Sequence, residues 1–253
     1  LTELMQCYTD LGAFNKGAEF SDRIHQFQQC AENRKRPVLR FEPDLQQAIT
    51  IDLSANAINE YMKLFAGRED TYTIENFRAG NGRKTEQVPD PLTEEVIHRH
   101  LRGEITAGTY VQRSNSTVKY LVIDIDISKR ILLLNGNQAD EMKAYLQKAA
   151  ELTGKYQAEL MHMGFSAYPE ESGYRGFHLW LFFDEWIPVR YVHLLEDMLD
   201  QKIPVDEDIS VEYFPNKAHQ KNGKMGQSIK LPYGIHARTG KRSRMLNDDF
   251  KPI

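Results

Sequence analysis

The 253-residue sequence has few cysteines and no long apolar run. Its two cysteines, Cys7 and Cys30, are too few for a four-ligand zinc site, and no histidine lies beside them at ligand spacing. We therefore expect no zinc, and reduced thiols in a cytoplasmic protein. Since no stretch is long and apolar enough to span a membrane and no secretory signal begins the chain, we also expect no membrane partner.

Acidic residues are missing from residues 214–247, although the whole chain has a net charge of −4. The rest of the chain carries 24 basic and 36 acidic residues, a net charge of −12. A segment of charge +8 on such a body is typical of a surface that binds phosphate groups, and a basic loop without a partner is the alternative. The basic residues of the segment are Lys217, Lys221, Lys224, Lys230, Arg238, Lys241, Arg242 and Arg244.

The clearest pattern in the chain is the strict alternation within residues 119–128, KYLVIDIDIS. Aliphatic residues occupy positions 121, 123, 125 and 127, whereas Asp124 and Asp126 fall on the opposite face. This period of two predicts a strand with one buried face. Neighbouring like charges destabilise a strand unless a cation compensates them, so the pair indicates either a divalent metal site or two solvated carboxylates.

Periodicity and capping signals predict an α+β fold. We expect a helical extension over residues 1–50 and a second unit over 51–253 whose core, about 117–235, is an RRM- or ferredoxin-like antiparallel sheet. Residues 119–214 give the order β-α-β-β-α-β, with both helices on one face. Helices are expected at 54–66, 92–101, 137–153 and 188–201, strands at 108–113, 119–128, 157–167, 175–183 and 209–214, and a polar loop at 76–90.

Two histidines, His98 and His100, fall on the helix expected at 92–101. Residues two apart on a helix do not share a face, so they cannot act together on one ion. We expect both to be surface residues.

In this topology the first and third strands are central neighbours, and the fourth strand pairs with the first. The open face then gathers Asp124 and Asp126 from the first strand, His178 from the third and Glu212 from the fourth. Three carboxylates can hold two divalent cations a few ångströms apart, a pair that activates a 3′-hydroxyl and stabilises a leaving pyrophosphate.

A glycine-rich turn, residues 172–176, precedes the third strand. Its backbone amides, with Ser172, Arg175 and Gly176, are suited to bind phosphates, and a hairpin turn that needs glycine is the alternative. Lys230 and His236 are expected as further phosphate contacts.

A different interpretation comes from residues 175–182, RGFHLWLF, which nearly match the RNP1 pattern of RNA-recognition motifs on the same strand. However, His178 occupies a position that RNP1 keeps small, and the first strand offers carboxylates where stacking aromatics are needed. These features favour a catalytic sheet over an RNA-binding one.

At these residues the sequence resembles the archaeo-eukaryotic primase superfamily, whose motifs are a D-x-D, an S-x-x-x-G-x-H-like element and a late acidic residue. Here the motifs correspond to Asp124 with Asp126, to residues 172–178, and to Glu212. Further features, FAGRED at 65–70, VEYFP at 211–215 and KLPYGIH at 230–236, are similar to TOTE-type and CRISPR-associated primase-polymerases. The resemblance covers about residues 58–247.

The resemblance implies template-directed nucleotidyl transfer from NTPs or dNTPs with two Mg²⁺ or Mn²⁺ ions, often with primer initiation. It implies that Asp124, Asp126 and Glu212 hold the metals and that His178 holds the incoming triphosphate. Single-stranded DNA template, a primer strand, CRISPR adaptation proteins or other domains of a longer chain are the expected partners. The residues expected to bind nucleic acid are Arg68, Lys217, Arg238, Lys241, Arg242 and Arg244.

Two departures from the family pattern stand out. The third acidic residue is Glu212 where many relatives have Asp, and no cysteine-rich zinc element is present. The alternatives are a non-catalytic RRM-like nucleic-acid-binding domain and a metal-dependent nuclease that uses the same carboxylates.

Overall fold

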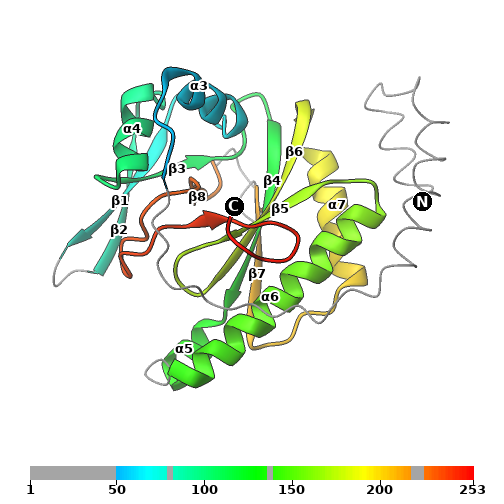
Figure 1. The fold of residues 1–253 in the computed structure, drawn as a ribbon. Helices are drawn as coiled ribbons and strands as arrows, with labels where there is room; N and C mark the ends of the chain where they lie inside the picture. Colours follow the sequence, from blue (N-terminus) through cyan, green and yellow to red (C-terminus); the bar gives the residue numbers. More distant parts are fainter. Residues whose placement is uncertain (1–49, 79–81, 136–138, 218–224) are drawn as a thin grey trace.

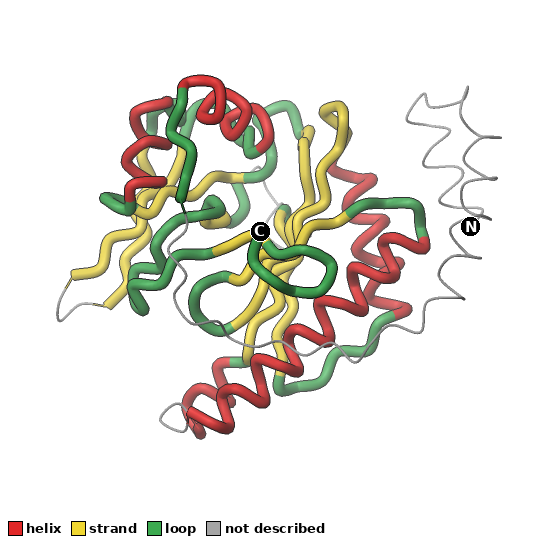
Figure 2. Tube along the Cα trace, in the orientation of Figure 1, coloured by secondary structure: helices red, strands yellow, loops and turns green. Residues whose placement is uncertain are grey.

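The computed structural model describes residues 50–78, 82–135, 139–217 and 225–253. They form two antiparallel sheets with helices packed outside them (Figures 1 and 2). The larger sheet has the strand order β7-β4-β6-β5-β9 and the smaller one has the order β2-β1-β3-β8. The helical extension expected at residues 1–50 lies almost entirely outside the described residues and stays a prediction.

The larger sheet contains the predicted β-α-β-β-α-β order. Its strands are β4 (Thr117–Ile127), β5 (Ala167–Glu171), β6 (Gly176–Pro188), β7 (Ile209–Phe214) and β9 (Arg244–Met245). As expected, β4 and β6 are central neighbours and β7 pairs with β4. The aliphatic positions of β4 are fully buried, which confirms the alternation seen in the sequence.

Two helices, α6 (Ala139–His162) and α7 (Val189–Lys202), cover one face of this sheet, and the short α5 (Lys129–Asn135) precedes them (Figure 1). The prediction of a strand over 157–167 is wrong. Tyr156 and Leu160 continue the buried face of α6, so the helix runs on to His162. Gly164, with φ of +88°, then turns the chain toward β5, because glycine adopts this left-handed conformation without steric cost.

The smaller sheet contains β1 (Tyr72–Arg78), β2 (Gly82–Val88), β3 (Thr106–Tyr110) and β8 (Ser228–Lys230). The loop predicted at 76–90 is therefore wrong, since most of it belongs to a hairpin in which Tyr72 pairs with Val88 and Arg78 with Gly82. Within residues 76–90 the only large apolar side chains are Phe77 and Val88, so this stretch lacks the apolar alternation that identifies a half-buried strand.

Helices α3 (Ala55–Leu64) and α4 (Glu94–Arg102) pack against each other beside the smaller sheet. Ser54 and Thr93 cap them through side-chain oxygens that accept backbone N–H groups, and Gly103 ends α4 in the left-handed conformation. The predicted boundaries are confirmed to within a few residues. Among the described helices, none combines the length and apolar composition needed to cross a bilayer.

The expected surface position of His100 is wrong, because the side chain is fully buried. Its Nδ1 accepts the Ala107 N–H at 3.0 Å, so Nε2 carries the proton donated to the Pro232 carbonyl at 3.0 Å. Burial lowers its pKa to about 4, which keeps the ring neutral. Gly234 lies against the ring, where a Cβ would stand 2.2 Å from His100 Cε1. His100 thus joins β3 to the segment that follows β8.

Candidate active site

A row of four side chains crosses the larger sheet on the face away from α6 and α7. Asp124 on β4 pairs with Glu212 on β7 and with His178 on β6, and His178 pairs with Glu170 on β5. Residues directly opposite one another in an antiparallel sheet point to the same face. The predicted convergence of Asp124, His178 and Glu212 is therefore confirmed by the strand register.

Asp126 lies two residues further along β4, next to the start of β6. Its Oδ2 is 2.7 Å from Nη2 of Arg175, and Nη1 of Arg175 donates to the Ile127 carbonyl at 2.9 Å. Gly176 lets β6 approach this closely, because a Cβ there would lie 2.1 Å from the Ile125 carbonyl oxygen and 2.6 Å from Asp126 Oδ1. Arg175, predicted as a phosphate contact, is thus the counter-ion of Asp126 here.

Asp124 is the least compensated carboxylate of the row. Its buried Oδ1 accepts no hydrogen bond from the described residues, and Nε2 of His178 is 3.8 Å away. Burial raises its pKa to about 7, and the charge of Asp126 adds to the effect. A carboxylate held in this way gains from a cation, since a positive charge favours the ionised form.

The donor set fits a hard divalent cation, because Asp124, Asp126 and Glu212 offer carboxylate oxygens on one face. In the described part of the chain, however, no three Asp, Glu, His or Cys side chains are close enough to ligate one ion as they stand. Asp126 is engaged by Arg175, and Glu212 Oε1 accepts a 3.4 Å hydrogen bond from Asn216. Holding a metal would therefore require these contacts to be exchanged.

Glu170 is a site residue that sequence reasoning missed. Its Oε2 accepts a hydrogen bond from His178 Nδ1 at 2.8 Å and from Trp180 Nε1 at 2.7 Å. Although burial raises its pKa, the opposing charge of His178 brings the pKa of Glu170 below its usual value. The sequence does place Glu170 only two residues before the glycine-rich turn. Because the sequence predicts a strand that ends at residue 167, it does not predict that Glu170 lies on a strand beside His178.

The smaller sheet supplies a cation to the site. Lys230 on β8 is buried, and its Nζ donates to the Ser172 carbonyl at 2.6 Å. Burial raises the pKa of Asp126 above its usual value, and Arg175, His178 and then Lys230 act against it. For Glu170 burial also raises the pKa, but His178 and then Lys230 outweigh it. Lys230 and Ser172, predicted together as phosphate contacts, are indeed neighbours.

A second loop docks on the glycine-rich turn. The ring of His236 lies 5.0 Å from that of Tyr174, and the Thr239 hydroxyl donates to the Gly173 carbonyl at 2.7 Å. The guanidinium of Arg238 lies over the Tyr174 ring, 5.2 Å from its centre. The predicted residue His236 is therefore brought to the turn, and the two segments form one surface.

The residues predicted to bind nucleic acid fall into two groups. Arg238 and Lys241 are exposed. The other four are engaged or buried within the protein. Arg68 is paired with Asp70 at 2.6 Å, Lys217 contacts Asp197, Arg242 donates to the Leu101 carbonyl at 2.7 Å, and Arg244 is 9% exposed.

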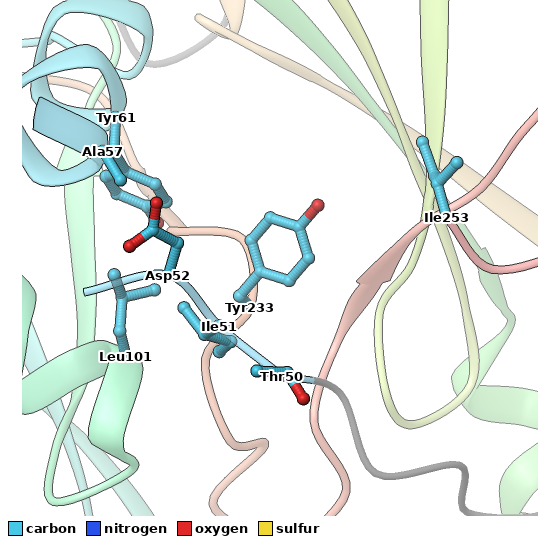
Figure 3. Close-up of a pocket in the computed structure, with 8 residues that line it drawn as sticks. All are labelled: Thr50, Ile51, Asp52, Ala57, Tyr61, Leu101, Tyr233 and Ile253. Carbon is cyan, nitrogen blue, oxygen red and sulfur yellow. The ribbon is translucent and has the colours of Figure 1, made fainter. Parts of the chain in front are cut away.

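A cavity of about 260 Å³ lies beside the row rather than in it. Figure 3 shows Tyr233 between Tyr61, on α3, and Ile253. Burial, and then the charge of Glu170, raises the pKa of both tyrosines. The Tyr61 hydroxyl donates to the Pro232 carbonyl at 2.8 Å, so this wall is fixed. None of the predicted site residues lines the cavity.

Solved structures that are similar to the chain include two domains. One is the polymerase domain of Mycobacterium tuberculosis Ligase D in complex with DNA, with 18% identity, a TM-score of 0.37, and coverage of 68% of this chain but only 62% of that one. The other is the AEP domain of the cyanophage S-2L primase-polymerase (PrimPol), with 14% identity, a TM-score of 0.42, and coverage of 79% and 93%.

No curated protein matches the sequence. The model of one family, described as "TOTE conflict system, Archaeo-Eukaryotic Primase domain", matches residues 77–253, which is well over half of the chain and includes the whole row of site residues. The chain therefore belongs to the archaeo-eukaryotic primase domain family of TOTE conflict systems.

Proposed function

We propose that the protein is a DNA primase-polymerase, a template-directed nucleotidyltransferase that makes and extends primers from NTPs or dNTPs. Membership of the primase family implies nucleotidyl transfer. The observation that carries the proposal is the row of Glu212, Asp124 and His178 in strict register on the open sheet face. Asp126 lies on the same face, and three neighbouring carboxylates do not suit a domain that only binds a polyanion, because they repel phosphates unless a cation lies between.

Asp124, Asp126 and Glu212 would hold Mg²⁺ or Mn²⁺ ions. When bound, such ions lower the pKa of a 3′-hydroxyl and stabilise the charge on a leaving pyrophosphate. The single-stranded template, the primer strand and the nucleotide are the proposed partners. CRISPR adaptation proteins or other domains of a longer chain stay proposals of the same kind.

The protein's own residues bind and orient the triphosphate. His178 presents Nε2 toward Asp124. Although burial lowers the pKa of His178, the charge and hydrogen bond of Glu170 raise it above its usual value, which favours the imidazolium. In that form Nδ1–H donates to Glu170 while Nε2–H can donate to a phosphate oxygen. Lys230 reaches the carbonyl of Ser172 and places its charge at the glycine-rich turn. Arg175 neutralises Asp126 in the absence of a cation and is free to turn to a phosphate once Asp126 has another partner.

One assay tests the proposal: unprimed single-stranded DNA with labelled NTPs or dNTPs, in the presence of Mg²⁺ or Mn²⁺. We expect labelled products that lengthen with time, and none from Asp124→Ala or Asp126→Ala, since each removes a metal carboxylate without removing a core residue. Circular dichroism of both variants checks that the fold is kept. Wild-type extension by either variant would refute the assignment.

The same samples separate the two alternatives. Incubation of a labelled single strand with the metal but without nucleotide detects cleavage, the result expected of a nuclease. Nucleotide binding that does not change with Mn²⁺, together with no extension, is the result expected of an RRM-like binding domain.

A further inference from the structure

Glu170 is a fully buried carboxylate, with 0% of its surface exposed. Removing an ionised carboxylate from water is costly unless hydrogen bonds and an opposite charge compensate it. The larger share of both comes from the sheet face itself, where Oε2 accepts from His178 Nδ1 and from Trp180 Nε1, and the charge of Lys230 adds to that of His178. The hydroxyl of Ser243 also lowers the pKa of Glu170, although neither it nor the other oxygen, Oε1, makes a hydrogen bond of normal geometry within the described residues.

The hydrogen-bond pattern fixes which nitrogen of His178 is which. Glu170 Oε2 is an acceptor that also receives the indole N–H of Trp180, so the imidazole must donate to it through Nδ1–H. Nε2 is then the nitrogen that faces Asp124, 3.8 Å away. Without an acceptor at Glu170 the ring can rotate or change tautomer, since no other described residue holds Nδ1 by a hydrogen bond.

We propose that Glu170 is the positioning residue for His178: it holds the imidazole by Nδ1 and so presents Nε2 to the triphosphate. This inference rests on the proposed role of His178 in nucleotide binding. Nothing in the family motifs includes Glu170, which lies on β5, one strand further from Asp124 than the histidine. A carboxylate that orients a histidine from behind is a recurrent arrangement wherever the other ring nitrogen performs chemistry.

Trp180 gives the chain a matched control. The same Glu170 oxygen accepts its indole N–H. Its ring packs edge-on against Phe65, the residue after α3, at 5.1 Å and stacks on Phe182 at 6.0 Å. Trp180→Phe removes one hydrogen bond to Glu170 but keeps an aromatic ring in this cluster and leaves the bond to His178. If Glu170 were only structural, loss of either hydrogen bond would affect nucleotide binding to the same degree.

The experiment compares Glu170→Leu, Glu170→Gln and Trp180→Phe with the wild-type protein. Leucine has a similar volume but no acceptor, whereas the glutamine side-chain carbonyl can still accept from Nδ1. We expect Glu170→Leu to raise the nucleotide KM about tenfold, a factor within the range for losing one hydrogen bond to a charged group. Template affinity should not change, and Glu170→Gln should restore most of the nucleotide affinity. Trp180→Phe should leave the KM close to wild type.

Nuclear magnetic resonance of ¹⁵N-histidine-labelled protein provides a readout that does not depend on activity. The wild-type His178 ring should carry a slowly exchanging proton on Nδ1, which is kept in Glu170→Gln and Trp180→Phe and lost in Glu170→Leu. A wild-type ring with an unprotonated Nδ1 overturns the proposal even if the leucine variant fails to fold. An unchanged KM in a folded Glu170→Leu variant overturns it as well.

The two proposals fail in different ways. If the protein does not extend primers, the function proposed above is wrong, but the Nδ1 proton of His178 and its dependence on Glu170 are still measured. If primers are extended and the Nδ1 proton is absent, only the positioning role is wrong.

Discussion

Glu196 on α7 shows what a single buried carboxylate does to stability. It is 3% exposed, and its Oε1 has no hydrogen-bond partner among the described residues. Burial raises its pKa to about 8, although Lys217 acts in the opposite direction. In the unfolded chain a glutamate titrates near pH 4.3. Between these two values the folded state keeps a proton that the unfolded state has released, so stability falls as the pH rises.

We therefore predict that Glu196→Gln stabilises the protein at high pH, because glutamine cannot ionise. Its Tm should exceed that of the wild type by at least about 2 °C at pH 8.5, the shift that roughly 1 kcal/mol produces in a chain of this size. The difference should shrink at pH 4.5. Thermal unfolding at both pH values measures it, with exposed Glu185→Gln as the control. A Tm difference that is the same at both pH values would contradict the prediction.

His178 is the residue whose loss should affect the nucleotide alone. Its 3.8 Å separation from Asp124 leaves Nε2 uncommitted to any hydrogen bond in the described structure. We predict that His178→Ala weakens nucleotide binding about tenfold, the effect of losing one charge-assisted hydrogen bond, and changes template binding much less. Titrations with nucleotide and with single-stranded DNA check both. If the variant loses only thermal stability, the histidine is a packing residue beside Trp180.

At the scale of elements, the glycine-rich turn depends on the loop that follows β8. Gly173 has φ of +82°, and a Cβ there would lie 3.0 Å from the Lys241 carbonyl. Gly240, in the docked loop, has φ of +69° but open space around it. Alanine costs about 1 kcal/mol of backbone strain at either position, whereas only the first also separates the two segments.

We predict that Gly173→Ala raises the nucleotide KM several-fold while Gly240→Ala leaves it unchanged. The two variants should lose a similar amount of stability, since they share the strained backbone. Thermal unfolding of the two variants measures the backbone strain that they share, and steady-state kinetics measures the effect of moving the turn away from the loop, which only Gly173→Ala causes. Equal KM values would show that the contact between turn and loop does not shape the phosphate site.

Sequence reasoning recovered those elements whose side chains are sorted by burial. The alternation in β4 and the amphipathic pattern of α7 each show which face of the element is buried. The positions of both elements, and the strand order around them, could therefore be predicted. The β1–β2 hairpin was not, because β2 is polar up to Val88 and the apolar residues of β1, Tyr72, Ile74 and Phe77, do not share one face. Residues 157–162 were misassigned because a buried helix face and a strand both present apolar side chains over a short window.

The same limit explains the site. Asp124, His178 and Glu212 were found because each stands out on a recognisable strand. Glu170 and the burial of His100 were not, since both depend on contacts that only the assembled fold creates. Pairing between β5 and β6 places Glu170 behind His178, and packing of α4 on the segment after β8 encloses His100.

At the scale of the whole molecule, the basic segment has two kinds of cation. Arg242 holds the Leu101 and Tyr233 carbonyls, and Arg244 is buried, so both support the fold. Arg238 and Lys241 are exposed beside the glycine-rich turn. The structure thus refines the expectation that this segment contacts the template, because a cation committed to backbone carbonyls has little left for phosphates.

We predict that Arg238→Ser and Lys241→Ser weaken the salt dependence of template binding. Each lost phosphate contact should reduce the slope of log K against log salt by about 0.7 on a single strand, with little effect of base sequence. Arg242→Ser should instead lower the Tm and leave the slope unchanged. Fluorescence anisotropy at several salt concentrations measures the slope. An unchanged slope in the Arg238/Lys241 double variant would direct the search for the template path elsewhere.

The row across β7, β4, β6 and β5 also governs what a wrongly folded molecule can do. If β4 paired one residue out of register, Ile123 or Ile125 would replace Asp124 on the open face, because successive side chains alternate. Such a molecule would offer no carboxylate to a cation at that position. If the proposed function is right, a copy with this register error has no activity, and the specific activity of a refolded sample reports the fraction of molecules in which β4 reached its native pairing.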